Sequence, residues 1–502
     1  MKTALPARAA AASLLTLLAA CGTVGPDYRV PAEAAIRKPS AAAPFVGAAE
    51  ATYSAAPLPP RWWRLYRDPA LDRLVEQALA ANADLRVADA NLRRARALEQ
   101  EVAAAGRPAL GVSAAPAYGR PSAAARGLPE ALPDAAFYDA GVSVSYQVDL
   151  FGKIARAIEA ADADSGAAAA AYDLARINVV AGTVRAYVDA CASSAQIGVA
   201  QRALALQQDF MDLTARRIAA GRGTALDASR AQAQVEQLHA ALPPLQAAQR
   251  GALLRLAALL GATPDSLPDS AARCTAPPRL AYPVPVGDGA ALLRRRPDIR
   301  QAERGLAAAS ARIGVATADL YPSVTLGLSA GSTGALASVG AGNALRWSLG
   351  PLISWTLPVN GAARSRIAQA EASSEAALAR FDGAVLNALR EAETSLTVYA
   401  RELDRNAALK AAREQSALAA SQASELYRYG RTDFLTTLDA QRSLASAESA
   451  LTASDAQLAS DQVTLFLALG GGWEGAEAQA AADSAESVDS VADSSNLIET
   501  RK

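Results

Sequence analysis

The sequence predicts a mainly α chain with a transmembrane β part, in which one strand-and-long-helix unit occurs twice. Three observations support this prediction. The chain has 502 residues, of which 51% are hydrophobic and only 5% aromatic, and alanine and leucine, which favour helices, supply most of that hydrophobicity. Two long parts of the chain resemble each other in sequence. Each part also includes segments in which apolar and polar residues alternate.

The duplication is visible in glycines that recur at a constant spacing. Gly221 and Gly261 are matched 209 residues later by Gly430 and Gly470. Matching residues at a constant offset indicate a repeated structural unit. The two halves are therefore expected to fold alike.

Each half is expected to contain one long helix between shorter helices. The long helices are expected over 153–219 and 362–428, and the first helices over 71–105 and 289–319. A return helix follows each long helix after a glycine turn. The spacing of three and four residues typical of a coiled-coil seam occurs at Ile177, Val180, Val184, Tyr187 and Cys191. We expect the shorter helices to lie end to end along the long one, although the same periodicity fits an extended coiled-coil hairpin.

Four segments of about ten residues alternate in polarity and predict β-strands near 109–119, 138–149, 323–331 and 345–358. Alternation of this length, with tyrosine and tryptophan near the ends, is typical of a transmembrane barrel. A half-buried soluble sheet is the alternative. Four strands cannot close a barrel and lipid does not tolerate open sheet edges, so several copies would have to pool their strands. Two copies would supply 8 strands, three 12 and four 16.

The N-terminus has the features of a lipoprotein signal. Lys2 and Arg8 are followed by an apolar stretch and then by Leu18-Ala19-Ala20-Cys21, which resembles a bacterial lipobox. Cys21 would become the mature N-terminus and carry covalent N-acyl and S-diacylglycerol groups, which tether a protein to a membrane. Gly22, in place of aspartate, fits sorting to the outer membrane.

These features divide the chain into six expected parts. They are a lipoprotein signal peptide (1–20), a lipid-anchored extended N-terminal segment (21–70), a first repeat (71–265), a connector (266–288), a second repeat (289–473) and a disordered polar tail (474–502).

Composition argues against several functional classes. The formal net charge is −1 without a basic block, so nucleic-acid binding is not expected. One histidine and three cysteines exclude most histidine-ligated metal sites, and no phosphate-binding glycine-rich loop with lysine is present. Neither an enzyme nor a cofactor is therefore expected. Whether Cys191 and Cys274 form a disulfide is left open by the sequence.

Six motifs, taken together, resemble the outer-membrane factors of the TolC type, in particular their lipoprotein (NodT-like) branch. They cover nearly all of residues 18–473, in order. The motifs lie at Cys21–Pro31, Trp62-Trp63 with Asp68–Leu71, Arg295–Ile299, Tyr321–Ser323, Leu438–Arg442 and Leu467–Trp473.

This resemblance implies a homotrimer that forms a 12-stranded β-barrel in the cell outer membrane, continued by a 12-helix periplasmic α-barrel. Such a trimer would be the passive exit duct of a tripartite efflux pump for drugs or other small molecules. Its partners would be a periplasmic adaptor and an inner-membrane transporter, expected to be of the resistance-nodulation-division class. The alternatives are the exit duct of a type I protein-secretion system and a non-channel periplasmic coiled-coil scaffold.

The resemblance also places the working ends of the protein at the two glycine turns. In relatives these tips close the tunnel and receive the adaptor. The adaptor-contact candidates are Gly221, Thr224, Leu226, Gly430, Asp433 and Leu435. The gate candidates are Asp433, Tyr429 and Arg431. If the three Asp433 carboxylates of a trimer converge, each is expected to raise the pKa of the others, and the ring to bind cations.

Ordinary turn chemistry is the alternative reading of the tips. Thr224 or Asp433 would then cap a return helix. Tyr429 resembles the tyrosine that relatives use for hydrogen bonding at the tip, and its alternative role is packing at the turn. Asp227 and Asp439 are expected on helix surfaces or in salt bridges between helices.

Overall fold

The computed structural model describes residues 22–49, 52–120, 122–124, 127, 129–266, 269–280 and 283–471. The expected signal peptide, Cys21 and the polar tail lie outside the described residues. The chain divides into two compact units. The strand unit comprises Met1–Pro31, Asn91–Ala169 and Gln301–Phe381, and the helical unit comprises Ala32–Ala90, Ala170–Arg300 and Asp382–Lys502.

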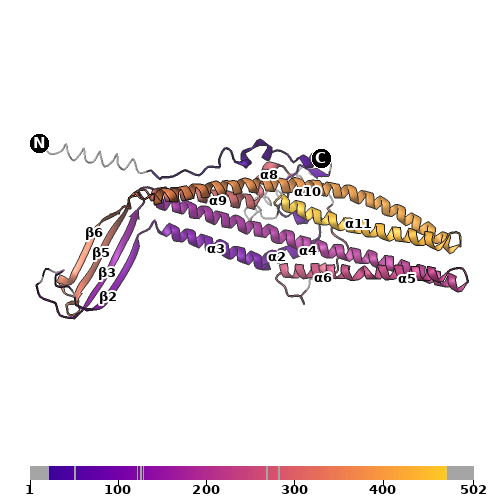
Figure 1. Cartoon of the computed structure of the whole chain (residues 1–502), viewed down its shortest axis with the longest axis horizontal. Coiled ribbons are helices and arrows are strands. Elements are labelled where there is room, and N and C mark those ends of the chain that lie inside the picture. The colour runs from indigo at the N-terminus through magenta and orange to yellow at the C-terminus, as the bar shows by residue number, and fades with distance from the viewer. Residues whose placement is uncertain are drawn as a thin grey trace, which may run out of the picture. The chain divides into compact units, whose positions relative to one another are not determined.

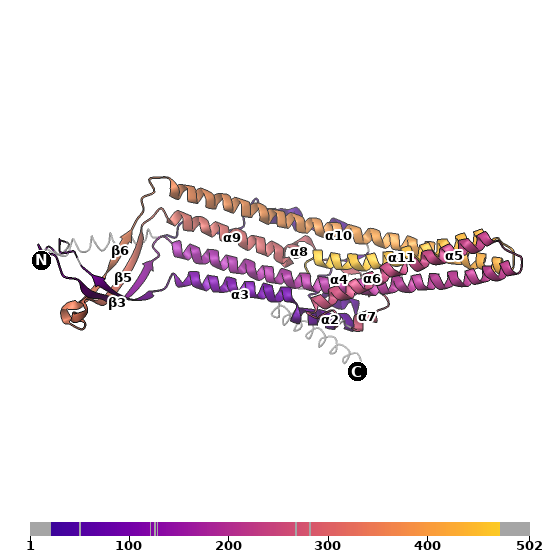
Figure 2. The same cartoon turned by 60° about the horizontal axis from the view of Figure 1, so that its bottom comes forward.

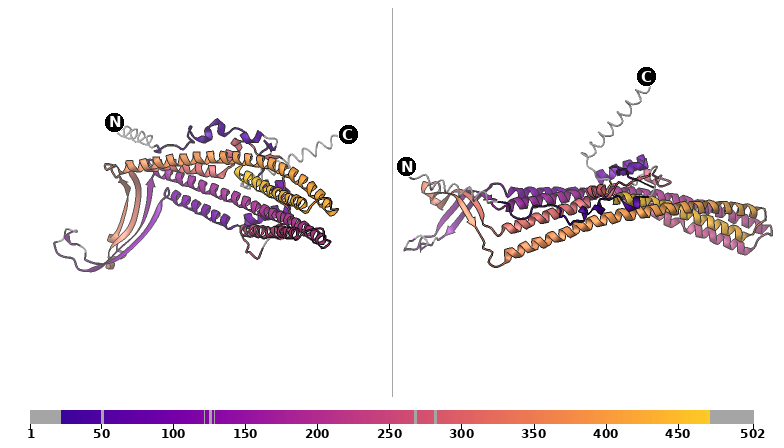
Figure 3. Two further views of the ribbon diagram at one scale, coloured as in Figure 1. Left: turned by 45° about the vertical axis from the view of Figure 1, so that its right-hand side comes forward. Right: turned by 90° about the horizontal axis from the view of Figure 1, so that it is seen from above.

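Four antiparallel strands in the order β2-β3-β5-β6 form the sheet of the strand unit (Figure 1). They are β2 (Ala109–Gly119), β3 (Ala135–Val148), β5 (Ser323–Ala335) and β6 (Leu345–Ser354). The sheet is visibly curved (Figure 3). β5 runs four residues beyond the expected end because β3 also begins early and pairs with it there. β6 stops four residues short of the expected end because its partner β5 has no residue beyond Ser323 to pair with it.

The two faces of this sheet differ in side-chain size. Its apolar face carries large exposed side chains, including Leu110, Val112, Leu345, Trp347 and Leu349, which are 70–80% exposed. Its small-residue face carries Gly111, Ser113, Asp139, Gly141, Ser143, Ser145, Thr325, Gly327, Ser329, Gly331, Arg346, Ser348 and Gly350, with Phe137 and Leu352 as large apolar exceptions. The alternation predicted from sequence therefore separates the two kinds of side chain onto opposite faces.

The two long helices have the predicted bounds. They are α4 (Lys153–Ala219) and α10 (Ala362–Arg428), each of 67 residues. In the helical unit α5 (Ala225–Ala240) lies beside α4, and α11 (Phe434–Ala468) lies beside α10 (Figure 2). Among the described residues, no helix combines the length and the hydrophobicity that crossing a membrane would require.

The first helix of each half is broken, contrary to the prediction of one continuous helix. The segment 71–105 contains α2 (Pro69–Ala81) and α3 (Ala83–Ala104). Asn82 separates them because its backbone is extended and its Oδ1 accepts the backbone N–H groups of Asp84 and Leu85, as an N-cap does.

In the second half the break falls between α8 (Gly289–Arg295) and α9 (Pro297–Ala318). Arg296 adopts an extended backbone there, because a proline disfavours the helical conformation of the residue that precedes it.

The return helix of the first half is also broken, whereas α11 in the second half is continuous. α5 (Ala225–Ala240) and α6 (Leu242–Leu259) meet at Ala241. Pro243 and Pro244 follow the break, and each lacks the N–H group that a continuous helix needs. No proline occurs within α11.

Equivalent positions of the two halves join the shorter helices in the helical unit. Asn82 Nδ2 donates to the carbonyl of Leu259 at 3.0 Å. Arg296, 214 residues later, donates from Nη1 to the carbonyl of Ala468 at 3.0 Å. Each bond holds the end of a return helix at the break of the first helix, as expected for helices placed end to end.

Residues 32–70 of the N-terminal segment and the connector belong to the helical unit. Three short 3₁₀ helices (Ala35–Arg37, Pro39–Ala41 and Val46–Ala49) show that the N-terminal segment is not extended throughout, in contrast to the prediction. The backbone N–H of Ala35 donates to Asp382 on α10 at 2.7 Å, so α10 supplies the partners that favour these compact turns. β1 (Tyr53–Ser54) pairs with β4 (Val284–Pro285) of the connector. Cys191 of α4 and Cys274 of the connector form a disulfide, a pairing that the sequence alone left undecided.

Residues 22–31 pack on the strand unit through two glycines and a buried arginine. Gly25, at φ +90°, approaches Gly314 of α9 so closely that a Cβ on Gly25 would lie 2.4 Å from the Gly314 Cα. The Arg156 side chain, 5% exposed, donates to the carbonyls of Val24 and Gly25 and pairs with Asp27 at 2.7 Å. Larger side chains at either glycine would separate the segment from α9.

We predict that Gly314→Ala releases residues 22–31, because a Cβ there would lie 2.8 Å from the carbonyl of Val24. Gly305→Ala is the matched control, since it lies in the same helix with nothing within 4 Å of a Cβ. The control should stabilise the helix by roughly 0.5–1 kcal/mol. Trypsin cleavage after Arg29, followed by mass spectrometry, should accelerate only in the Gly314 variant. Equal cleavage rates in both variants would contradict this packing.

Candidate functional site at the helical tips

The two turns of the helical unit share one backbone geometry. Gly221 and Gly430 adopt φ values of +71° and +74°, which glycine tolerates best. The N–H groups of Arg222 and Arg431 donate to carbonyls five residues earlier, at 2.8 Å in both turns. This bond is the Schellman pattern that ends helices. Nothing lies within 4 Å of a Cβ on either glycine, so backbone conformation rather than crowding selects glycine here.

The residues after the two turns cap the return helices, as predicted, but with different chemistry. Thr224 forms a reciprocal capping box with Asp227, in which each side chain accepts the other residue's backbone N–H. Asp433 accepts the backbone N–H of Thr436 at 2.7 Å. Asp227, expected on a helix surface or in a salt bridge between helices, lies in the first turn of its helix as a capping residue and makes no inter-helix salt bridge among the described residues. Asp439 lies exposed on α11.

A cluster of three aromatic side chains joins the two hairpins just behind the turns. Phe210 of α4 stacks on Phe434 of α11 with ring centroids 5.3 Å apart, and Tyr427 of α10 lies 5.3 Å from Phe210. Ala231 of α5 and Leu438 of α11 complete this buried cluster. All four helices of the tips therefore contribute to one small core.

Arg217 closes this core on the side of the first turn. Its guanidinium carbon lies 4.1 Å from the centre of the Tyr427 ring, a cation–π arrangement. Its Nη1 also donates to the backbone carbonyl of Tyr427. Arg217 thus links the end of α4 to the end of α10.

The structure places the adaptor-contact candidates on the surface of the tips. Leu226 and Leu435, the second residues of their return helices, are 57% and 54% exposed. Gly221, Thr224, Gly430 and Asp433 are exposed as well. Side chains at these positions are accessible to a partner.

The gate candidates do not form a cluster within one chain. Tyr429 is 70% exposed, so it does not pack at the turn as one reading of the sequence expected. Across the described residues, Asp433 makes no ion pair with Arg431 or Arg222. Its carboxylate instead receives the amide of Thr436, and this hydrogen bond lowers the pKa of Asp433 below its usual value.

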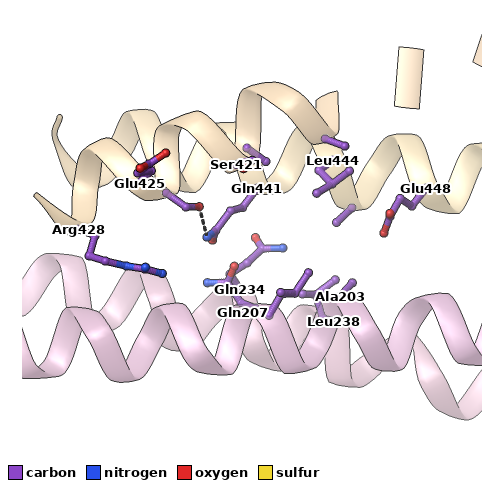
Figure 4. Close-up of a pocket in the computed structure, with 15 residues that line it drawn as sticks. Ala203, Gln207, Gln234, Leu238, Ser421, Glu425, Arg428, Gln441, Leu444 and Glu448 are labelled. Carbon is purple, nitrogen blue, oxygen red and sulfur yellow. Dashed lines mark hydrogen bonds between the residues drawn. The ribbon is translucent and has the colours of Figure 1, made fainter. Parts of the chain in front are cut away.

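A cavity of about 480 Å³ lies between the α4–α5 and α10–α11 hairpins behind the aromatic cluster. Gln207 and Gln234 point into it from one hairpin and Gln441 from the other (Figure 4). Gln441 donates to Ser424 at 3.4 Å, and Arg442 donates to Gln234 at 2.6 Å.

Two buried amide atoms at this cavity, Gln207 Nε2 and Gln441 Oε1, have no hydrogen-bond partner among the described residues. Amides of this kind can bind neutral polar groups but supply neither a nucleophile nor a base. No group of three or more potential metal ligands occurs in the described parts of the chain.

Sequence reasoning did not identify Tyr427, Phe210 or Arg217 as tip residues. The sequence did contain a signal for Tyr427. Ala420, Ala423 and Tyr427 are spaced three and four residues apart, which places them on one helix face, and that face is buried. Tyr429 lies off that face. No comparable pattern marks Arg217.

We predict that Tyr427→Ala opens both tips, whereas Tyr429→Ala does not. Truncating a buried aromatic side chain lowers the free energy of unfolding by on the order of 3 kcal/mol. Truncating an exposed one changes it by no more than about 0.5 kcal/mol. The measurement is amide hydrogen exchange at residues 220–226 and 430–436. Exchange should accelerate in both turns of the Tyr427 variant, and protection equal to that of the Tyr429 variant would show that the cluster does not hold the tips.

We further predict that the cap at Asp433 weakens in acid. A pKa lowered on folding stabilises the folded tip above the unfolded value of 3.8, and this stabilisation disappears as the pH falls through the folded pKa. The exchange protection factor of the Thr436 amide should therefore fall below about pH 4. Asp433→Asn keeps a capping oxygen that does not titrate, so its Thr436 protection should be independent of pH. The same acid loss in that variant would assign the effect to another group.

Comparisons with known proteins agree with this architecture. The family model described as outer membrane efflux protein matches residues 74–262 and 290–471. Nodulation protein T of Rhizobium leguminosarum bv. trifolii is 30% identical over 413 residues, covering 82% of this chain and 88% of that protein. Outer membrane protein OprJ of Pseudomonas aeruginosa is 31% identical over 476 residues, covering 93% and 97%.

Solved structures show the same likeness. The outer-membrane channel OprN matches with a TM-score of 0.84 and 38% identity, over 90% of this chain and 100% of that one. The outer membrane protein VceC of Vibrio cholerae matches with a TM-score of 0.76 and 27% identity, over 83% and 100%. The resemblance inferred from the motifs is confirmed, and the chain belongs to the outer membrane efflux protein family.

Proposed function

We propose that this protein is the outer-membrane exit duct of a tripartite efflux pump and passively conducts drugs or other small molecules to the exterior. Family membership supports the outer-membrane location and the transport role. The structural observation that carries the proposal is the sheet of the strand unit. Most of its large apolar side chains are exposed on one face, and most of its small and polar side chains lie on the other. Among the described residues, its outer strands β2 and β6 each pair with a single neighbouring strand.

The open edges of the sheet favour a closed assembly. Each unpaired backbone group in lipid costs several kcal/mol, so β2 of one copy would pair with β6 of the next. Three copies would then supply 12 strands, with the apolar face toward lipid and the small-residue face toward a water-filled lumen. The helices would continue this homotrimer as a 12-helix periplasmic tunnel.

The tips are the proposed contact with the other pump components. Leu226 and Leu435 offer exposed apolar side chains beside the two turns, where a helical hairpin of a periplasmic adaptor would bind. Gly221, Thr224, Gly430 and Asp433 would contribute to the same contact, and Asp433, Tyr429 and Arg431 remain the gate candidates. An inner-membrane transporter of the resistance-nodulation-division class would supply the energy.

Lipidation of Cys21 is part of the proposal. Thr23, two residues after Cys21, lies against Gly152, where a Cβ would approach the Thr23 side chain to 2.4 Å. Gly152 follows shortly after the end of β3. Acyl chains on Cys21 would therefore anchor the chain near the base of the strands, where a membrane would meet them.

The expected result for the detergent-extracted protein is a trimeric native mass and ion conductance in planar bilayers. Val112→Lys and Ser113→Lys test the orientation of the sheet, since these neighbours lie on opposite faces of β2. Lysine facing the lipid midplane costs roughly 2–4 kcal/mol, so the Val112 variant should lose outer-membrane trimer while the Ser113 variant keeps it. A monomeric native mass, or equal trimer yields from both variants, would overturn the proposed duct.

A further inference from the structure

One ion pair interrupts the otherwise uncharged small-residue face of the sheet. Across the described residues of β2, β3, β5 and β6, Asp139 and Arg346 are the only charged side chains, and both lie on this face. Arg346 Nη2 lies 2.5 Å from Asp139 Oδ1. The charged side chains of the four strands therefore all lie in this one ion pair.

A glycine of the intervening strand leaves room for this pair. β5 lies between β3 and β6, and its Gly331 is the register partner of both Gly141 and Arg346. Because Gly331 has no side chain, the guanidinium can cross β5 to reach β3. A Cβ on Gly141 would lie 3.6 Å from Arg346 Nη2, an ordinary van der Waals distance, so Gly141 marks where the guanidinium reaches β3.

The position and exposure of the pair favour a role in conduction rather than in stability. The Arg346 and Asp139 side chains are 43% and 48% exposed, and an exposed ion pair contributes little to folding. Asp139 is the fifth residue of β3 and Arg346 the second of β6. Both therefore lie near the end of the sheet where the β2–β3 and β5–β6 loops connect the strands (Figure 1).

We propose that Asp139 and Arg346 set the ion selectivity of the exit of the duct. This inference rests on the proposed function, in which three copies enclose a lumen with the small-residue face inward. Each carboxylate is neutralised by a guanidinium, so the exit carries no net charge at this level and admits small cations, anions and zwitterions. Loss of either partner leaves three like charges around the lumen, which attract ions of the opposite sign.

The experiment measures the cation-to-anion permeability ratio of purified trimers from the reversal potential in a salt gradient. Arg346→Gln should raise this ratio severalfold, and Asp139→Asn should lower it severalfold. The double variant should return to the wild-type ratio. The changes should grow at low salt, since the Debye length is about 30 Å at 0.01 M and about 10 Å at 0.1 M.

The matched control is the Arg120–Asp134 ion pair, which lies outside the strands with similar exposure and an N–O distance of 3.0 Å. Arg120→Gln also leaves one unpaired carboxylate per chain, so its smaller effect on the ratio would locate selectivity at the Asp139–Arg346 pair. Conducting variants with an unchanged ratio, or equal changes from Arg120→Gln, would overturn the inference. Absence of conductance in the wild-type protein would instead overturn the proposed duct. If Arg346→Gln does not assemble, Asp139→Asn, which preserves side-chain volume, tests the inference by itself.

Discussion

The unpaired outer edges of β2 and β6 constrain the rest of this protein. In the described part of the chain each of these strands has a single neighbour, so a row of backbone N–H and C=O groups on each edge lacks a strand partner. Such edges are tolerated in water but are costly in a bilayer, where nothing else can accept or donate these hydrogen bonds. The large side chains of the apolar face add a second surface that water solvates poorly. Under the proposed function one assembly solves both problems, because copies that pair edge to edge also turn their apolar faces outward.

In the helical unit, equivalent positions of the two halves make the same helix-to-helix hydrogen bond with different residues. Asn82 and Arg296 hold the ends of the two return helices, one through a neutral amide and the other through a guanidinium. The guanidinium has further partners, since it also bonds both oxygens of Asp298 and one of Glu391. The two halves are therefore equivalent in backbone arrangement but not in chemistry. Gly261 and Gly470, both in the left-handed region, pass so close to these junctions that a side chain would collide with Ala81 or Arg296.

The tips are organised by packing and by capping. One aromatic cluster receives side chains from both hairpins, so a displacement of either hairpin must disturb Phe210, Tyr427 or Phe434. Behind this cluster, Gln207 Nε2 and Gln441 Oε1 in the cavity have no hydrogen-bond partner among the described residues, so separating the hairpins there would break fewer hydrogen bonds. The tips thus combine a small apolar core with a polar cavity behind it.

Much of the fold was determined by the sequence alone, because periodicity and turn chemistry act over short distances. The bounds of α4 and α10, the two glycine turns, the caps at Thr224 and Asp433, and the strand alternation all depend on residues within a few positions of one another. The breaks of the helices were missed, although local signals such as Asn82 and Pro297 were present. The gate and lipid-anchor assignments remain predictions.

Only the tertiary structure decided which distant residues meet. The Cys191–Cys274 disulfide, the Asp139–Arg346 pair and the contact of Arg217 with Tyr427 each join residues 83 to 210 positions apart. Helix and strand periods assign a side chain to a face but not to a partner, because the partner depends on how separate elements pack. The same limit explains why Tyr429, the more visible tyrosine in the sequence, proved exposed while Tyr427 lies in the core.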